Sequence, residues 1–184
     1  MYRSYLNPAI ARKSFPKNTN EYALASLSIR RLWHTIYDHC PKLLELCPPD
    51  GKKLLDEFLQ YADDNSLSMN WTMHLHLLSW LNQHKIWREK IDNSIKEELM
   101  IASALRWGRG NSDDVNEIKK HSMAIYVPCL EGKAVGIKRS DIPLNNSSVF
   151  ILKSMGDNLP KHISYCLPEL INQWNLDNWN SIPK

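Results

Sequence analysis

The fold is decided by residues 71–107, WTMHLHLLSWLNQHKIWREKIDNSIKEELMIASALRW, which contain no proline or glycine and carry four of the seven tryptophans. Proline and glycine disfavour a helix interior more than any other residues, so their absence favours helix. In the second half, apolar residues recur every three or four positions, matching the 3.6-residue helical period. They are Trp87, Ile91, Ile95, Leu99, Ala102 and Leu105. The stretch predicts helix, in one piece or in two, with a bend allowed at residues 82–84.

Two helices are also predicted before this stretch. One begins near Asn20 and ends before Pro41, whose ring prevents a helix from continuing. The next begins after Asp50 as N-cap and ends at Asp63–Asn65. Its apolar stripe is Leu54, Leu55, Phe58, Leu59 and Ala62, whereas the first helix carries a broad apolar face. These regions together predict a helical body over residues 20–108.

The sequence after this body predicts a smaller mixed α+β part, residues 112–184. Short β-prone runs surround Glu131–Lys133, which is typical of a β-hairpin. The runs are Ala124–Val127 and Ala134–Ile137, with Val149–Leu152 as a candidate third strand. Pro160 is suited to the first turn of a last helix. The predicted fold class is therefore mainly α, a helical body with a small C-terminal α+β element, forming one compact domain overall.

Composition excludes several protein classes. The chain has 184 residues, of which 43% are hydrophobic and 23% charged, as is usual for a soluble globular domain. No apolar run is long enough for a secretory signal or a membrane span. A chain of this size buries a sufficient core without disulfides, so its four cysteines are expected to be reduced. We therefore expect a soluble, cytoplasmic protein with no membrane contact.

The first 19 residues predict an irregular basic arm, because Pro8 and Pro16 interrupt them and they contain no acidic residue. Their cations are Arg3, Arg12, Lys13 and Lys17. Flexible segments with arginine and aromatic residues can enter a minor groove or stack on bases. With Arg106 and Arg109, the arm supports one alternative for the function, nucleic-acid binding.

Protein binding is the reading that the sequence favours. Seven tryptophans are many for 184 residues, and tryptophan and arginine most often anchor protein interfaces when they are exposed. The candidate binding residues are Arg3, Arg12, Lys13, Arg106 and Arg109 for anionic contacts, with Trp107, Trp174 and Trp179 as apolar anchors. No assembled catalytic set is recognised. The sequence therefore predicts a non-enzymatic macromolecule-binding protein of regulatory, inhibitory or immunity type, and it leaves the oligomeric state open.

Glu131 and Lys133 provide a further alternative, a metal-dependent nuclease. In such enzymes a carboxylate holds the metal ion while a lysine stabilises the attacking water or the phosphate. That chemistry requires the pair inside a core strand. Gly132 instead places both residues at the tip of the predicted hairpin, where a charged turn is expected.

Two pairs of residues with helical spacing are candidate sites. His162 and Cys166 stand four apart on the predicted last helix, as two ligands of one zinc ion would. A structural zinc site normally shows two close ligand pairs, so no metal and no cofactor are predicted. His34 and Asp38 have the same spacing and could orient a general base, although a hydrogen bond on the helix surface is commoner.

His74 and His76 stand two apart on a predicted helix and therefore point in different directions. They cannot share one ion without other ligands. One is expected to be buried and hydrogen-bonded, and the other exposed.

Overall fold

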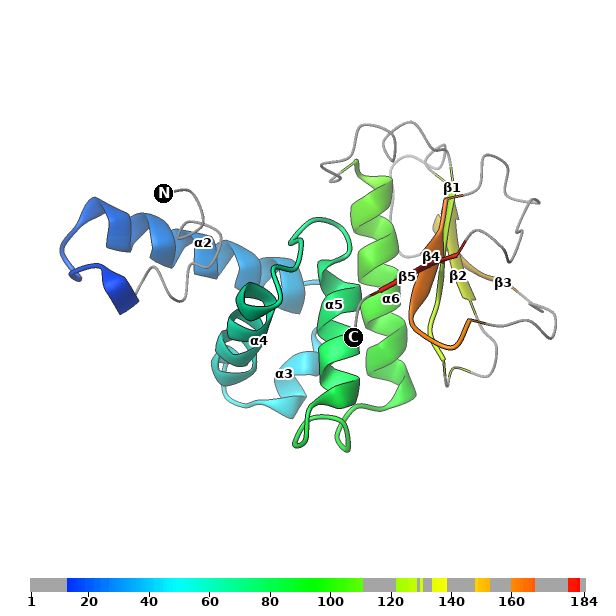
Figure 1. Ribbon diagram of the computed structural model, residues 1–184, viewed down its shortest axis with the longest axis horizontal. Coiled ribbons are helices and arrows are strands. Elements are labelled where there is room, and N and C mark those ends of the chain that lie inside the picture. The colour runs from blue at the N-terminus through cyan, green and yellow to red at the C-terminus, as the bar shows by residue number, and fades with distance from the viewer. Residues whose placement is uncertain are drawn as a thin grey trace. The chain divides into compact units, whose positions relative to one another are not determined.

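The computed structural model describes residues 13–110, 122–128, 130, 134–138, 148–152, 160–167 and 179–182 (Figure 1). Its helices are α2 (Asn20–Tyr37), α3 (Lys42–Leu46), α4 (Lys52–Asp64), α5 (Met73–Gln83) and α6 (Asn93–Gly108). Its strands are β1 (Ser122–Tyr126), β2 (Ala134–Lys138), β3 (Val149–Leu152), β4 (Ser164–Cys166) and β5 (Asn180–Ser181). The chain divides into two compact units, Met1–Ser68 and Met69–Lys184. No helix among the described residues is both long and apolar enough to cross a membrane.

The first unit contains α2, α3 and α4. Thr19 caps α2, since its side-chain oxygen accepts a hydrogen bond of 3.2 Å from the backbone N–H of Tyr22. The predicted apolar stripe of α4 is confirmed, and all five of its residues are buried. The N-cap of α4 is Gly51 rather than the expected Asp50, although Asp50 still accepts a hydrogen bond from the Lys52 N–H at 3.1 Å.

The turn before α4 is held by two aromatic side chains of α2. The indole N–H of Trp33 donates to the carbonyl oxygen of Asp50 at 2.6 Å, and the Tyr37 hydroxyl donates to that of Gly51 at 2.6 Å. Gly51 has a φ of +67°, a left-handed conformation that favours glycine. A Cβ at this position would also overlap the ring of Tyr37. This turn therefore requires glycine for two separate reasons.

The tryptophan-rich stretch forms two helices, α5 and α6, which confirms one of the two predicted forms. The turn between them begins at His84, whose Nδ1 accepts hydrogen bonds from the N–H groups of Ile86 at 3.2 Å and Trp87 at 3.4 Å. It ends at Asp92, which caps α6 by accepting from the N–H of Ile95 at 2.9 Å. Every residue from 71 to 81 is buried, so α5 and the residues just before it lie in the interior of the second unit.

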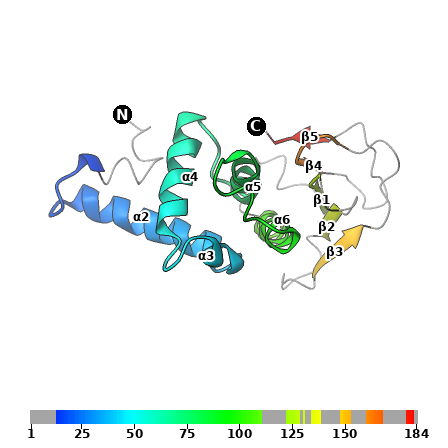
Figure 2. The same cartoon turned by 90° about the horizontal axis from the view of Figure 1, so that it is seen from below.

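The strands form one antiparallel sheet in the order β3-β2-β1-β4-β5. Helix α6 packs against β1, β2 and β3 on one face of the sheet, and α5 lies on the other side of α6 (Figures 1 and 2). The predicted hairpin is confirmed by the pairing of β1 with β2, and the candidate third strand by the pairing of β2 with β3. The mixed fold class is thus observed, with more strands than the sequence indicated.

One predicted element is wrong. The helix expected from Pro160 is replaced by strand β4, in which Ala124 of β1 pairs with Cys166 and Tyr126 pairs with Ser164. This pairing satisfies backbone groups of β1 on the side away from β2, a requirement that no local pattern reveals. Helices α5 and α6 belong to the same compact unit as the sheet.

Candidate functional site

The cations proposed from the sequence have different surroundings. Arg3 and Arg12 lie outside the described residues, whereas Lys13 and Arg109 are exposed. Arg106 is partly buried, and its Nη2 donates a hydrogen bond of 2.9 Å to the carbonyl oxygen of Met69. Its guanidinium therefore ties the end of α6 to the segment that leads into α5.

The proposed tryptophan anchors are also separated from one another. Trp107 has 0% of its surface exposed, so the structure places it in the packed interior of the second unit. Trp174 lies outside the described residues. Trp179 is partly exposed, and its ring meets that of Tyr126 in a T-shaped arrangement with centroids 6.4 Å apart. Of these three, Trp179 alone is seen with part of its surface open to solvent.

His162 and Cys166 do not lie on one helix, in contrast to the spacing from which they were considered as a pair. His162 is exposed, while Cys166 lies in strand β4 and is buried. Burial raises the pKa of the Cys166 thiol to about 12, which keeps it protonated and unreactive. Within the described part of the chain, no three His, Cys, Asp or Glu residues are grouped so that they could hold a metal ion. Glu131 and Lys133, the proposed nuclease pair, lie outside that part.

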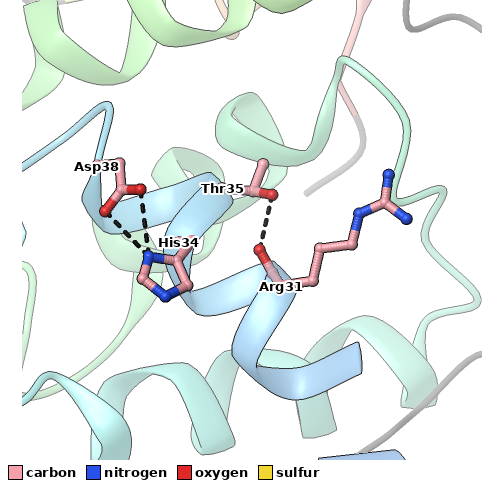
Figure 3. Close-up of polar contacts among 4 residues, drawn as sticks. All are labelled: Arg31, His34, Thr35 and Asp38. Atoms are coloured by element: carbon pink, nitrogen blue, oxygen red, sulfur yellow. Dashed lines mark hydrogen bonds and ion pairs between the residues drawn. The ribbon is translucent and has the colours of Figure 1, made fainter. Parts of the chain in front are cut away.

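His34 and Asp38 form the surface pair that helical spacing allows. Nδ1 of His34 lies 3.3 and 3.2 Å from the two carboxylate oxygens of Asp38, and the side chains are 49% and 58% exposed (Figure 3). The Thr35 hydroxyl donates to the carbonyl oxygen of Arg31 at 2.8 Å, and the Arg31 guanidinium extends away from the pair. The arrangement orients the imidazole, but the pair faces solvent on a convex helix surface.

The expectation for His74 and His76 is wrong, because both are buried. Helix α5 buries all of its residues from Met73 to Leu81, so side chains that point in different directions both meet protein. Burial lowers the pKa of His76 from 6.5 to about 4, so its imidazole is neutral at physiological pH. Nδ1 of His76 is buried, and no described residue forms a hydrogen bond with it.

The feature most suited to binding lies on α2. Leu24 is 58% exposed and Leu27 is 61% exposed, whereas Ala25 and Ile29 on the opposite side of the helix are buried. Sequence reasoning assigned these leucines to one broad apolar face. The width of that face was the signal that sequence reasoning missed. A face so broad cannot pack all of its apolar residues against a single neighbouring element, so some of them stay exposed.

The leucines are accompanied by exposed positive charge. Arg30 and Arg31 follow them on the same helix and are both exposed. We call Leu24, Leu27, Arg30 and Arg31 the α2 face. The N-terminal half of α2 extends past α4 in both views of the first unit (Figures 1 and 2).

A family model described as "Methanobactin biosynthesis cassette protein MbnC-like" matches residues 12–183. The chain belongs to the MbnC-like family. No curated protein matches this MbnC-like chain.

The region matched by the family model includes the α2 face. It covers nearly the entire chain, so α2 lies within the MbnC-like region. The family description names a biosynthesis cassette and assigns no chemical step to the MbnC-like protein.

Proposed function

We propose that this MbnC-like chain acts in methanobactin biosynthesis as a non-catalytic component that binds a protein partner through the α2 face. The observation that carries the proposal is the exposure of Leu24 and Leu27, 58% and 61%, on adjacent turns of one helix. Among the large apolar side chains of the described residues, just one other, Ile86, is so exposed.

The energetic argument rests on apolar area. Burying a leucine side chain that would otherwise stay in water contributes about 1.5–3 kcal/mol. Two leucines three positions apart lie on the same side of a helix, so one partner surface can cover both. Apolar side chains at the centre of a contact, with cations beside them, follow the common plan of a protein interface.

The same surface supports a protein partner over nucleic acid. Contacts with nucleic acid are made mainly to phosphate and sugar, which offer little to an exposed leucine pair. The guanidinium of Arg106 is engaged with the carbonyl of Met69 and is not a free surface cation. Lys13 and Arg109 remain candidates for anionic contacts because both are exposed.

The family description supports a biosynthetic role over the inhibitory or immunity role that the sequence left open. A binding component in a biosynthetic assembly needs a partner-specific surface and no reaction centre of its own. An exposed leucine pair supplies such a surface.

The proposal is tested by co-expressing the chain with each of the other proteins encoded in a methanobactin biosynthesis cassette. Size-exclusion chromatography should reveal a stable complex with at least one of them. The double variant Leu24→Ser, Leu27→Ser should then raise the Kd at least tenfold without changing the thermal stability of the free chain. Ile86→Ser is the control, because it removes another large apolar side chain that is 51% exposed.

Two outcomes would reject the proposal. One is the absence of a complex with every cassette protein. The other is a complex whose affinity falls equally for the α2 double variant and for Ile86→Ser, since the α2 face would then have no special role.

A further inference from the structure

The charges around the exposed leucines indicate the chemistry of the partner. Residues 13–31 contain four cations and one acid. All five side chains are exposed: Lys13, Lys17, Glu21, Arg30 and Arg31. Farther along α2, the carboxylate of Asp38 is already engaged with His34. A partner that covers this surface would therefore gain from carboxylates placed opposite the two arginines.

The shape of the surface indicates the kind of element that docks. Leu24, Leu27 and Arg31 are separated by three and four residues, so they form one stripe along α2. The stripe is about 10 Å long, because each helical residue rises about 1.5 Å. Such a ridge on a convex helix packs well into the groove between side chains of a second helix. Along the stripe, apolar side chains precede the cation, which gives the contact a direction.

We infer that the partner contacts the α2 face with an acidic amphipathic helix, its apolar side chains against Leu24 and Leu27 and its carboxylates against Arg30 and Arg31. This inference rests on the proposed function and adds the chemistry of the partner. Arginine suits the polar half of such a contact, because its planar guanidinium binds carboxylates through two parallel hydrogen bonds.

A second copy of the same chain fits this surface poorly. Pairing two α2 faces would bring two cation-rich surfaces together, and like charges across an interface oppose association. Among the described residues, neither arginine of the α2 face forms an ion pair within its own chain. The guanidinium of Arg31 extends away from the His34–Asp38 pair (Figure 3). Both arginines are therefore available to a partner that carries acidic residues.

Site-specific photocrosslinking of the complex with the cassette partner tests the inference. The photoreactive residue p-benzoylphenylalanine replaces Ser28, which is exposed and leaves both leucines intact. A control chain carries it in place of Lys52, which is exposed on α4. After irradiation and proteolysis, mass spectrometry should identify a crosslinked partner peptide from Ser28 that is net negative and has helical apolar spacing, with none from Lys52.

The outcomes separate this inference from the proposed function. A crosslinked peptide that is basic or uncharged, or that comes from a second copy of the chain, would overturn the acidic helix. So would a stable complex that gives no crosslink from Ser28, although protein binding itself would stand. The absence of any complex would instead overturn the proposed function.

Charge reversal gives an independent readout on the same complex. Arg30→Glu with Arg31→Glu should weaken binding at least tenfold and reduce its dependence on salt, because attractive pairs become repulsive. Lys52→Glu with Lys53→Glu is the charge-matched control on α4 and should leave the affinity within about twofold. Equal effects from the two double variants would show that net charge alone matters and would overturn the placement at α2.

Discussion

The hydroxyl of Ser103 on α6 donates a hydrogen bond of 2.8 Å to the backbone carbonyl of Trp71, thirty-two positions earlier in the chain. Both residues have 0% of their surface exposed. The bond satisfies a carbonyl just before α5 that water cannot reach. It also fixes the start of α5 against the middle of α6.

Ser103→Ala is therefore expected to lower the free energy of unfolding by about 1–3 kcal/mol, because the carbonyl of Trp71 loses a buried partner. Urea unfolding followed by tryptophan fluorescence measures the change. Ser28→Ala, an exposed serine on α2, controls for the difference in helix propensity and should be neutral or slightly stabilising. Equal stabilities for the two variants would mean that the hydroxyl of Ser103 contributes nothing.

The helices could be predicted because their signals are local. Apolar spacing identified α4 and α6, and the absence of proline and glycine marked the region of α5. Strand β4 could not be predicted in this way. Its residues pair with β1 some forty positions away, and only the assembled sheet supplies those partners.

Gly51 and Gly110 make a matched pair for testing the turn before α4. Both have positive φ, +67° and +77°, so alanine is strained at either position. At Gly51 an added Cβ would also overlap the ring of Tyr37, whereas at Gly110 it would meet no atom of the described residues within 4 Å.

Gly110→Ala is expected to cost about 1 kcal/mol, the penalty of the left-handed conformation alone. Gly51→Ala should cost at least about 1 kcal/mol more, because the Tyr37 ring must move and its bond to the Gly51 carbonyl is disturbed. Thermal unfolding of both variants provides the comparison. The close approach of Tyr37 would be unimportant if both melted at the same temperature.

His76 predicts a dependence of stability on pH. Burial lowers its pKa from 6.5 to about 4. Between these two values the imidazole of His76 is protonated in the unfolded chain and neutral in the folded chain. The folded state therefore loses stability as the pH falls from about 6.5 to 4, by about 2 kcal/mol at pH 5 for this group alone.

Urea unfolding between pH 7.5 and 4.5 measures this effect. His76→Leu removes the titrating group and should flatten the curve over that range. His162→Gln removes an exposed histidine and should leave the slope unchanged. Parallel curves for the parent chain and His76→Leu would show that His76 is not the cause.

The candidate site was only partly accessible to sequence reasoning. The sequence marked arginines and tryptophans as surface anchors because those residue types dominate interfaces. Burial decides which of them can serve, and Trp107 has 0% of its surface exposed. Leu24 and Leu27 belong to the broad apolar face predicted for this helix, and hydropathy alone does not show that they are 58% and 61% exposed.

Arg106 and Arg109 both lie at the end of α6. Arg106 has a structural role, whereas Arg109 is a surface residue. Arg106 donates to the carbonyl of Met69 at 2.9 Å, and its Nη1 lies 3.6 Å from the sulfur of Met73, so it joins segments more than thirty positions apart.

Arg106→Ala should lower the free energy of unfolding by about 1–3 kcal/mol, since a charged donor and the packing of its stem are lost together. Arg106→Lys should recover only part of this, because an ammonium group cannot reproduce the planar fork. Arg109→Ala, which removes an exposed side chain, should change stability by less than about 0.5 kcal/mol. Urea unfolding of the three variants under identical conditions gives the order of their stabilities. An Arg109→Ala variant as unstable as Arg106→Ala would contradict the structural role assigned to Arg106 alone.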